Sequence, residues 1–356
     1  MPDLFDPLTL RGVTLRNRIG VSPMCQYQAT EGVANDWHLV HLATRAVGGN
    51  GLVIAEATAV EPEGRISPGC LGLWNDEQTD AFARITTLLR DHGTVPGLQL
   101  GHAGRKASTV VPWEGDGPLA TGDGAWPVVA PSAVPFADGF PVPQELTLDR
   151  IAELVTAFRS AASRALEAGF ELLELHAAHG YLMHSFHSPI SNHRDDRYGG
   201  DLVGRTRFTR EVARAVREVW PDTLPLAVRL SVSDWIDGGW SLDDSVELAG
   251  WLGEDGVDLI DCSSGGTARG VRIPLEPGYQ VPFAERIRHE AGIATAAVGL
   301  ITEPSQAQAI IASERADLVL LARESLRDPY WPRRAAAELD ALEHLEVPRS
   351  YERAWA

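Results

Sequence analysis

The chain has 356 residues, of which 44% are hydrophobic and 22% charged, and its net charge at pH 7 is −18. This composition is typical of a folded globular protein with a sizeable core and argues against disorder. The negative charge argues against a nucleic-acid partner, because no basic field is available to displace counterions from phosphates.

Apolar runs rich in Val, Ile and Leu alternate along the chain with amphipathic stretches, which is typical of a parallel sheet wrapped by helices. About eight such units can be counted, and no GxGxxG motif follows the first strand. We therefore predict an α/β protein with a single (β/α)8 TIM barrel over residues 1–356. The predicted strands are residues 18–22, 52–57, 95–100, 171–176, 226–231, 257–263, 295–299 and 318–323.

Local signals mark the predicted helix ends. Asn75, Thr147 and Ser241 each precede an amphipathic stretch as N-cap residues do. Gly93 and Gly292 follow such stretches as C-terminal glycines do. These boundaries agree with the barrel prediction, because each cap falls between two predicted strands.

Residues 101–145 interrupt the alternation, since they are rich in Gly, Pro and Trp and far longer than a usual strand–helix loop. Long excursions at the catalytic end of a barrel are usually lids or binding loops. We predict that this insertion after the third strand caps the active site, with an irregular structural insertion as the alternative.

Two histidines and a tyrosine, His176, His179 and Tyr181, lie at the end of the predicted strand 171–176 and just after it. Chemistry in parallel α/β folds is carried by this end of the strands. The residues alone leave three roles open for the histidines: metal ligands, a general acid/base pair, or hydrogen-bond donors to an oxyanion. Three more histidines follow closely: His184, His187 and His193. No HxH or HExxH spacing appears, so we favour catalysis and predict no metal.

Other predicted strand ends contribute to the same site, as expected of a barrel enzyme. They carry Ser22, Pro23, Met24 and Cys25 after the first strand, Ala57 after the second, Gln99 at the third and Arg229 at the fifth. Gly299 and Arg323 end the seventh and eighth strands, where such barrels often bind phosphate through loop amides and a guanidinium. A surface salt bridge is the alternative role for Arg323.

Membrane and redox signals are weak. No apolar run approaches the roughly 18 residues that span a bilayer, and the first residues lack the features of a secretion signal. The three cysteines, Cys25, Cys70 and Cys262, are too scattered for a disulfide framework or a CxxC motif. We therefore expect a cytoplasmic protein with no membrane partner.

Five motifs, in order along essentially the whole chain, resemble those of a known family. They are residues 22–27 (SPMCQY), 99–106 (QLGHAGRK), 176–181 (HAAHGY), 191–200 (SNHRDDRYGG) and 323–331 (RESLRDPYW). In these motifs the chain resembles the old yellow enzymes, which are flavin-dependent ene-reductases, and more closely their bacterial thermophilic-like subgroup.

The resemblance implies non-covalent FMN at the barrel mouth, with NADPH or NADH as reductant. Ser22, Pro23, Met24 and Cys25 would line the isoalloxazine, with Ala57, Gln99 and Arg229 at its pyrimidine side. Ala322 and Arg323 would hold the phosphate, assisted by the backbone of Gly299. Cys25 would tune the flavin potential, its alternative being a small buried hydrophobe. Ala322 stands where many relatives have glycine, which would crowd the phosphate loop slightly.

The reaction implied by the resemblance is hydride transfer from flavin N5 to activated alkenes, namely α,β-unsaturated carbonyl or nitro compounds. His176 and His179 would donate hydrogen bonds to the substrate oxygen, Tyr181 would protonate carbon, and Tyr27 would face the substrate. Arg353, in the C-terminal tail of residues 340–356, would enter the neighbouring subunit's site, which implies a homodimer or homotetramer.

Two other functions stay open. One is a flavin-binding sensor barrel without turnover. The other is a Schiff-base or metal-dependent enzyme on the same barrel, for which Lys106 is the only lysine available to form an imine.

Overall fold

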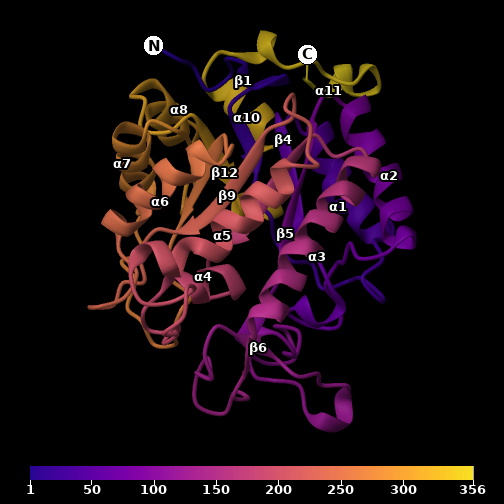
Figure 1. Cartoon of the computed structure of the whole chain (residues 1–356). Helices are drawn as coiled ribbons and strands as arrows, with labels where there is room; N and C mark the ends of the chain where they lie inside the picture. Colours follow the sequence, from indigo (N-terminus) through magenta and orange to yellow (C-terminus); the bar gives the residue numbers. More distant parts are fainter. Residues whose placement is uncertain (356) are drawn as a thin grey trace.

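Eight parallel strands close into a barrel at the centre of the structure, a computed structural model that describes residues 1–355 (Figure 1). Each strand pairs with the next along the chain, and the last pairs with the first. Every predicted strand overlaps an observed one, so the predicted (β/α)8 barrel is confirmed. The barrel strands are β3 (Ile19–Val21), β4 (Leu52–Ala59), β5 (Val95–Gly101), β8 (Leu172–Ala177), β9 (Leu226–Ser231), β10 (Leu259–Ser263), β11 (Ala294–Ala297) and β12 (Leu318–Leu321).

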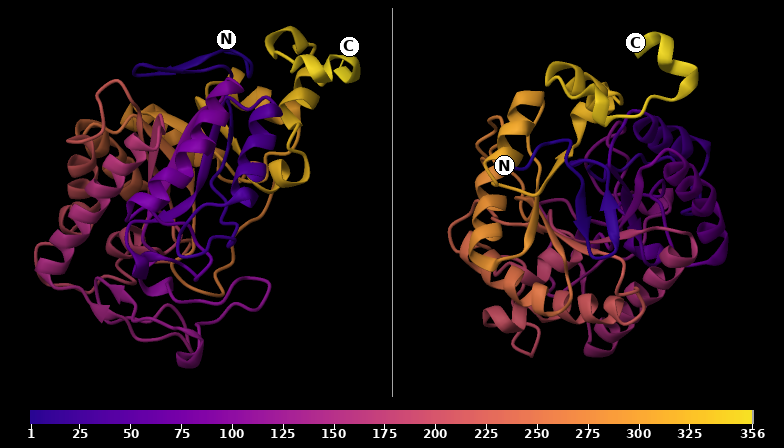
Figure 2. Two further views of the ribbon diagram at one scale, coloured as in Figure 1. Left: turned by 90° about the vertical axis from the view of Figure 1, so that its right-hand side faces the viewer. Right: turned by 90° about the horizontal axis from the view of Figure 1, so that it is seen from above.

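A ring of helices surrounds these strands, as the view from above in Figure 2 shows. Asn75 and Ser241 form capping boxes, and the side chain of Thr147 accepts from a backbone N–H at its helix start, as predicted. The larger helices are α1 (Asp36–Val47), α2 (Asp76–Asp91), α3 (Leu148–Glu167), α5 (Leu202–Arg217), α6 (Leu242–Glu254), α7 (Val281–Ala291), α8 (Pro304–Ala312) and α10 (Trp331–Glu338). Shorter ones are α4 (Leu182–His187), α9 (Arg323–Arg327) and α11 (Glu352–Trp355). Among residues 1–355, no helix is both long and apolar enough to cross a membrane.

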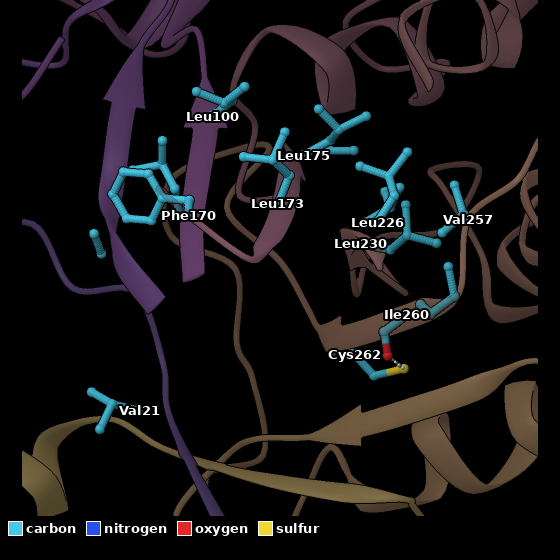
Figure 3. Close-up of a cluster of buried hydrophobic side chains, with 14 of the residues drawn as sticks. Val21, Leu100, Phe170, Leu173, Leu175, Leu226, Leu230, Val257, Ile260 and Cys262 are labelled. Carbon is cyan, nitrogen blue, oxygen red and sulfur yellow. Dashed lines mark hydrogen bonds between the residues drawn. The ribbon is translucent and has the colours of Figure 1, made fainter. Parts of the chain in front are cut away.

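Side chains along each strand alternate between the barrel interior and the helix layer. On β8, Leu172 belongs to the interior cluster with Leu52 and Leu259. Leu173 and Leu175 belong instead to the cluster between strands and helices (Figure 3). This period of two decides which β8 side chains can reach the active site.

A hairpin of β1 (Leu8–Leu10) and β2 (Val13–Leu15) closes the N-terminal end of the barrel. Its four buried side chains, at the ends of the two strands, pack in the same cluster as the interior leucines. This hairpin was not predicted from the sequence, because strands of three residues are too short to show a period.

The predicted insertion lies between β5 and α3. It contains only short elements: the 3₁₀ turns Gly104–Lys106 and Thr121–Asp123, and the paired strands β6 (Val129–Ala130) and β7 (Gln144–Glu145). Figure 1 shows it at the end of the molecule opposite the N-terminal hairpin. α11 lies at the hairpin end.

Candidate active site at the barrel mouth

Polar side chains replace leucines towards the C-terminal ends of the strands, which together form the barrel mouth. Gln99, His176 and Arg229 are buried near the ends of β5, β8 and β9. His176 follows the interior residue Leu172 by four positions, so it also faces inward. The strand register places His176 opposite Arg229. The structure therefore brings these three predicted residues together.

His176, His179 and Tyr181 form a ring cluster beyond β8. The His176 ring centroid lies 5.2 Å from that of His179 and 4.9 Å from that of Tyr181, both in edge-to-face geometry. His179 and Gly180 have left-handed backbones, with φ of 59° and 73°. A Cβ on Gly180 would lie 2.2 Å from the carbonyl oxygen of Gly266, so this tight turn requires glycine. The turn returns Tyr181 to the side of His176.

Both imidazoles are neutral at neutral pH. Burial, and then the positive charge of Arg229, hold the pKa of His176 and of His179 well below the usual histidine value. The N–H of Ala178 donates to Nδ1 of His176 at 3.3 Å, so the proton of that ring sits on Nε2. Nε2 of His179 lies 2.7 Å from Oγ of Ser263. The pair can donate N–H hydrogen bonds but cannot serve as an acid.

Tyr181 retains its phenolic proton. Burial, with a smaller effect of the neighbouring Cys25, raises the pKa of the phenol well above its usual value. Nζ of Lys106 lies 5.0 Å from the ring centroid. A phenol of this kind gives up its proton only to a strong base, such as a carbanion next to a carbonyl group.

The loop after β3 carries five predicted residues: Ser22, Pro23, Met24, Cys25 and Tyr27. The N–H of Ser22 donates to the carbonyl oxygen of Leu321 at 2.9 Å, which ties this loop to β12. Burial, and then the nearby Glu56, raise the pKa of Cys25 well above its usual value, so the side chain is a neutral thiol. The loop thus presents a short, mostly apolar edge to the mouth.

A cavity of about 240 Å³ opens between the loops after β11 and β12, lined by Arg229, Gly299, Ala322 and Arg323. Gly299 has a φ of 123°, and a Cβ there would lie 2.9 Å from Nε2 of Gln280. Ala322 has a negative φ of −106°, so this position does not need the left-handed backbone that favours glycine. The guanidinium of Arg323, together with the backbone amides at the start of α9, suits a phosphate group.

A second cavity, of about 170 Å³, lies between the mouth and the insertion. Tyr27 and Tyr181 line it from the barrel, and Phe136 and Phe140 line it from the insertion. The Tyr27 ring packs edge-on against Trp113 of the insertion, with centroids 6.0 Å apart. Residues of the insertion therefore form part of the wall that a small molecule beside Tyr181 would touch.

Lys106 links the insertion to the loops after β8 and β10. Its Nζ donates to the carbonyl oxygens of His179 at 2.7 Å and Gly266 at 3.0 Å, and lies 4.4 Å from the Phe136 ring centroid. Burial, and then the charge of Arg105, lower the pKa of Lys106 to about 7. Because two carbonyls hold the amine, it is not presented as a nucleophile for imine formation.

Two histidines that were considered as metal ligands contact protein groups instead. Nε2 of His184 lies 3.2 Å from Oδ1 of the buried Asp234, and Nε2 of His187 lies 2.7 Å from Oγ1 of Thr209. The His187 ring also stacks on Trp240. Within residues 1–355, no group of three or more His, Cys, Asp or Glu side chains is arranged to hold a metal ion.

Two serines at the barrel mouth, Ser231 and Ser263, were not predicted. Oγ of Ser231 accepts from the N–H of His179 at 2.8 Å, and Ser263 contacts the ring of the same residue. Both serines are the last residues of their strands, so the rule that located Gln99 would also have found them. Ala57 lines a further cavity with His176 and Tyr181.

Arg353 is exposed and lies in α11, at the end of the molecule opposite the insertion (Figure 1). It is therefore not part of the barrel mouth of its own chain.

Comparison with known proteins decides the family. Residues 3–341 match the family described as NADH:flavin oxidoreductase / NADH oxidase. The chain belongs to this family. An NADPH dehydrogenase from Listeria innocua is 50% identical to this flavin oxidoreductase over 100% of both chains. One from Bacillus velezensis is 48% identical over 99% of each.

Solved structures agree with this assignment. An old yellow enzyme homologue from Zymomonas mobilis has a TM-score of 0.79 at 27% identity, covering 100% of this chain and 99% of its own. Morphinone reductase in complex with tetrahydroNAD has a TM-score of 0.79 at 28% identity, covering 98% of this chain and 93% of its own. The resemblance to old yellow enzymes is thus confirmed. The protein is an FMN-dependent oxidoreductase of this family, reduced by NADPH or NADH.

Proposed function

We propose that this flavin oxidoreductase reduces the C=C bond of α,β-unsaturated carbonyl or nitro compounds. The observation that carries the proposal is the cluster of His176, His179 and Tyr181, which gathers two neutral imidazoles and a neutral phenol at the barrel mouth. His176 and Tyr181 line one cavity there. Reduction of an activated alkene requires an oxyanion to be stabilised and a carbon to be protonated. The cluster provides groups for both tasks.

The two histidines stabilise the substrate oxygen. When bound, FMN supplies the hydride that is added to the β-carbon, and negative charge then develops on the carbonyl or nitro oxygen. N–H donors placed at that oxygen lower the barrier because they interact more strongly with the developing charge than with the neutral substrate. Neutral imidazoles suit this role, since they hold the oxygen without taking part in proton transfer.

Tyr181 protonates the α-carbon. Its proton is retained until a strongly basic carbon develops, which keeps the acid available for the alkene and prevents its loss beforehand. The cavity walls from Tyr27 and from the insertion hold the substrate against this phenol. Solvent then replaces the proton.

The flavin would be held as the family resemblance implies. Ser22, Pro23, Met24 and Cys25 would line the ring system, with Ala57, Gln99 and Arg229 at the pyrimidine end. Gly299, Ala322 and Arg323 surround the cavity that suits the phosphate. Morphinone reductase binds tetrahydroNAD, which supports a nicotinamide reductant here as well.

The proposal extends to assembly. Because Arg353 is exposed and distant from its own barrel mouth, it is free to reach the mouth of a second copy in a homodimer or homotetramer. We also propose a cytoplasmic location. Sedimentation of the full chain tests whether it forms a dimer or tetramer. Alkene reduction by an Arg353→Ala variant tests whether Arg353 acts at the neighbouring barrel mouth.

Anaerobic rapid mixing tests the function itself. The purified protein, loaded with FMN, should be bleached by NADPH or NADH and then re-oxidised by 2-cyclohexenone. His176→Ala should slow re-oxidation by about 10²- to 10³-fold, as the loss of an oxyanion donor typically does. His187→Ala, which removes a histidine outside the mouth, is the matched control and should leave this rate nearly unchanged. A flavin that neither nicotinamide reduces would instead favour the sensor barrel.

A further inference from the structure

A buried acid pair lies one layer below the catalytic histidine. Glu174 precedes His176 by two positions on β8 and therefore also faces the barrel interior. The register pairs Glu174 with Gln99 of β5, and Arg229 of β9 with Asp261 of β10. Glu174 and Asp261 are both 0% exposed. The reaction proposed above uses neither carboxyl group.

The charges of this layer do not balance if both acids are ionised. The groups that face Glu174 are Gln99 from β5, Arg229 from β9 and Asp261 from β10, with His176 above it on its own strand. The imidazole is neutral, so one guanidinium would face two carboxylates. Burying an uncompensated charge is energetically costly, and proteins generally avoid it by protonating the group.

Most of the carboxyl oxygens of Glu174 and Asp261 have no N–H donor in the described part of the chain. Nε2 of Gln99 donates to Oε1 of Glu174 at 2.7 Å. Oε2 of Glu174 and both oxygens of Asp261 are buried, and within residues 1–355 none of them accepts a hydrogen bond from an N–H group. The two carboxyl groups are nevertheless within hydrogen-bonding reach of each other. One proton between them satisfies an oxygen on each side.

The surroundings decide which acid carries the proton. Nε of Arg229 lies 3.1 Å from Oδ2 of Asp261, so the negative charge is best placed on Asp261. Glu174 faces a neutral amide instead. Burial, and then Asp261, raise the pKa of Glu174 to about 8, which agrees with this assignment.

We propose that Glu174 and Asp261 share one proton beneath Arg229, and that this pair is a positioning element that sets the charge presented to the pyrimidine end of the flavin. Glu174 donates its proton to Asp261, whose single negative charge balances Arg229. Release of that proton to solvent at high pH would add one negative charge below the flavin. The effect on the flavin rests on the proposed roles of Gln99 and Arg229 in binding it. The shared proton does not depend on those roles.

Infrared difference spectra of the holoenzyme test the shared proton. Wild type minus Glu174→Gln at pH 6 should show the C=O stretch of a protonated carboxyl group, since glutamine keeps both hydrogen bonds but lacks the acid. In Asp261→Asn, Glu174 becomes the sole counterion of Arg229, so the same band should be absent at pH 7. Glu171→Gln, at the partly exposed residue just before β8, is the matched control and should remove no band.

Two outcomes would overturn the shared proton: no Glu174 band at pH 6, or a band that survives in Asp261→Asn, which would mean that burial alone protonates Glu174. The link to the flavin is tested by its midpoint potential. Between pH 7 and 9 the potential should fall more steeply in wild type than in Glu174→Gln, because only wild type gains a negative charge. Equal slopes would refute this link. Failure of 2-cyclohexenone to re-oxidise the reduced holoenzyme would refute the proposed function while the infrared result stands.

Discussion

The two ends of the barrel interior are built from the same strands but obey different physical requirements. At the N-terminal end, Leu52, Leu172 and Leu259 pack against the hairpin and exclude water. Two to four residues further along the strands, buried Gln99, Glu174, His176 and Arg229 take their place. The first region stabilises the fold by apolar burial, whereas the second is stable only because each polar group finds a partner. Changes at the two ends should therefore have separable effects.

The largest effect is expected from Tyr181→Phe, at the mouth. Loss of a general acid typically costs about 10²- to 10⁴-fold in rate. Re-oxidation of the reduced flavin by an enone should slow by about this factor, while reduction by NADPH is nearly unchanged and the free energy of unfolding moves by less than about 1 kcal/mol. Stopped-flow of the two half-reactions measures this. Equal slowing of both would remove Tyr181 from the role of proton donor.

Leu172→Ala, at the N-terminal end of the barrel interior, should lower stability and leave the catalytic rates unchanged. Removing a buried leucine in a packed core costs about 2–5 kcal/mol in the free energy of unfolding, through lost transfer energy and the cavity left behind. Urea unfolding at several pH values should show the same loss at each pH, because no titrating group is involved. The rates of the two half-reactions at 25 °C should stay near wild type, and a large drop in either would mean that the two ends are coupled.

A smaller, pH-dependent effect is expected from Glu174→Gln. The pKa of Glu174 is raised from its usual value of about 4.5 to about 8, so between these values the folded protein binds more protons than the unfolded chain. Its contribution to stability is therefore complete below about pH 4.5 and is lost as pH rises to about 8. The slope is at most about 1.4 kcal/mol per pH unit.

Urea unfolding of wild type and Glu174→Gln at pH 5, 6.5 and 8 measures this contribution. The stability of wild type relative to the variant should decline steadily as pH rises. A constant difference, like that expected for Leu172→Ala, would show that Glu174 does not titrate in this range.

Much of the fold could be predicted because its signals are local. Each barrel strand is a short apolar run, and caps such as Asn75 and Ser241 lie within three residues of the groups they bond. The same holds for His176, His179 and Tyr181, which one strand end and one turn bring together. The hairpin of β1 and β2 escaped prediction because its apolar side chains are too few to show a period by themselves, and only the barrel interior explains why they are apolar.

The acid pair shows the limit of sequence analysis most clearly. In the sequence, Glu174 is a single polar residue within an apolar run, and Asp261 lies 87 positions away in the chain. Their interaction depends on which strands are neighbours and on the register that places Arg229 beside Asp261.

The sequence by itself determined the barrel, the family and the chemical groups at the strand ends, because period, caps and motifs act over a few residues. Only the tertiary structure decided the charge state of those groups. Burial and charged groups on other strands set the pKa values of His176 and Glu174, and burial chiefly sets that of Tyr181; closing the barrel is what creates these surroundings.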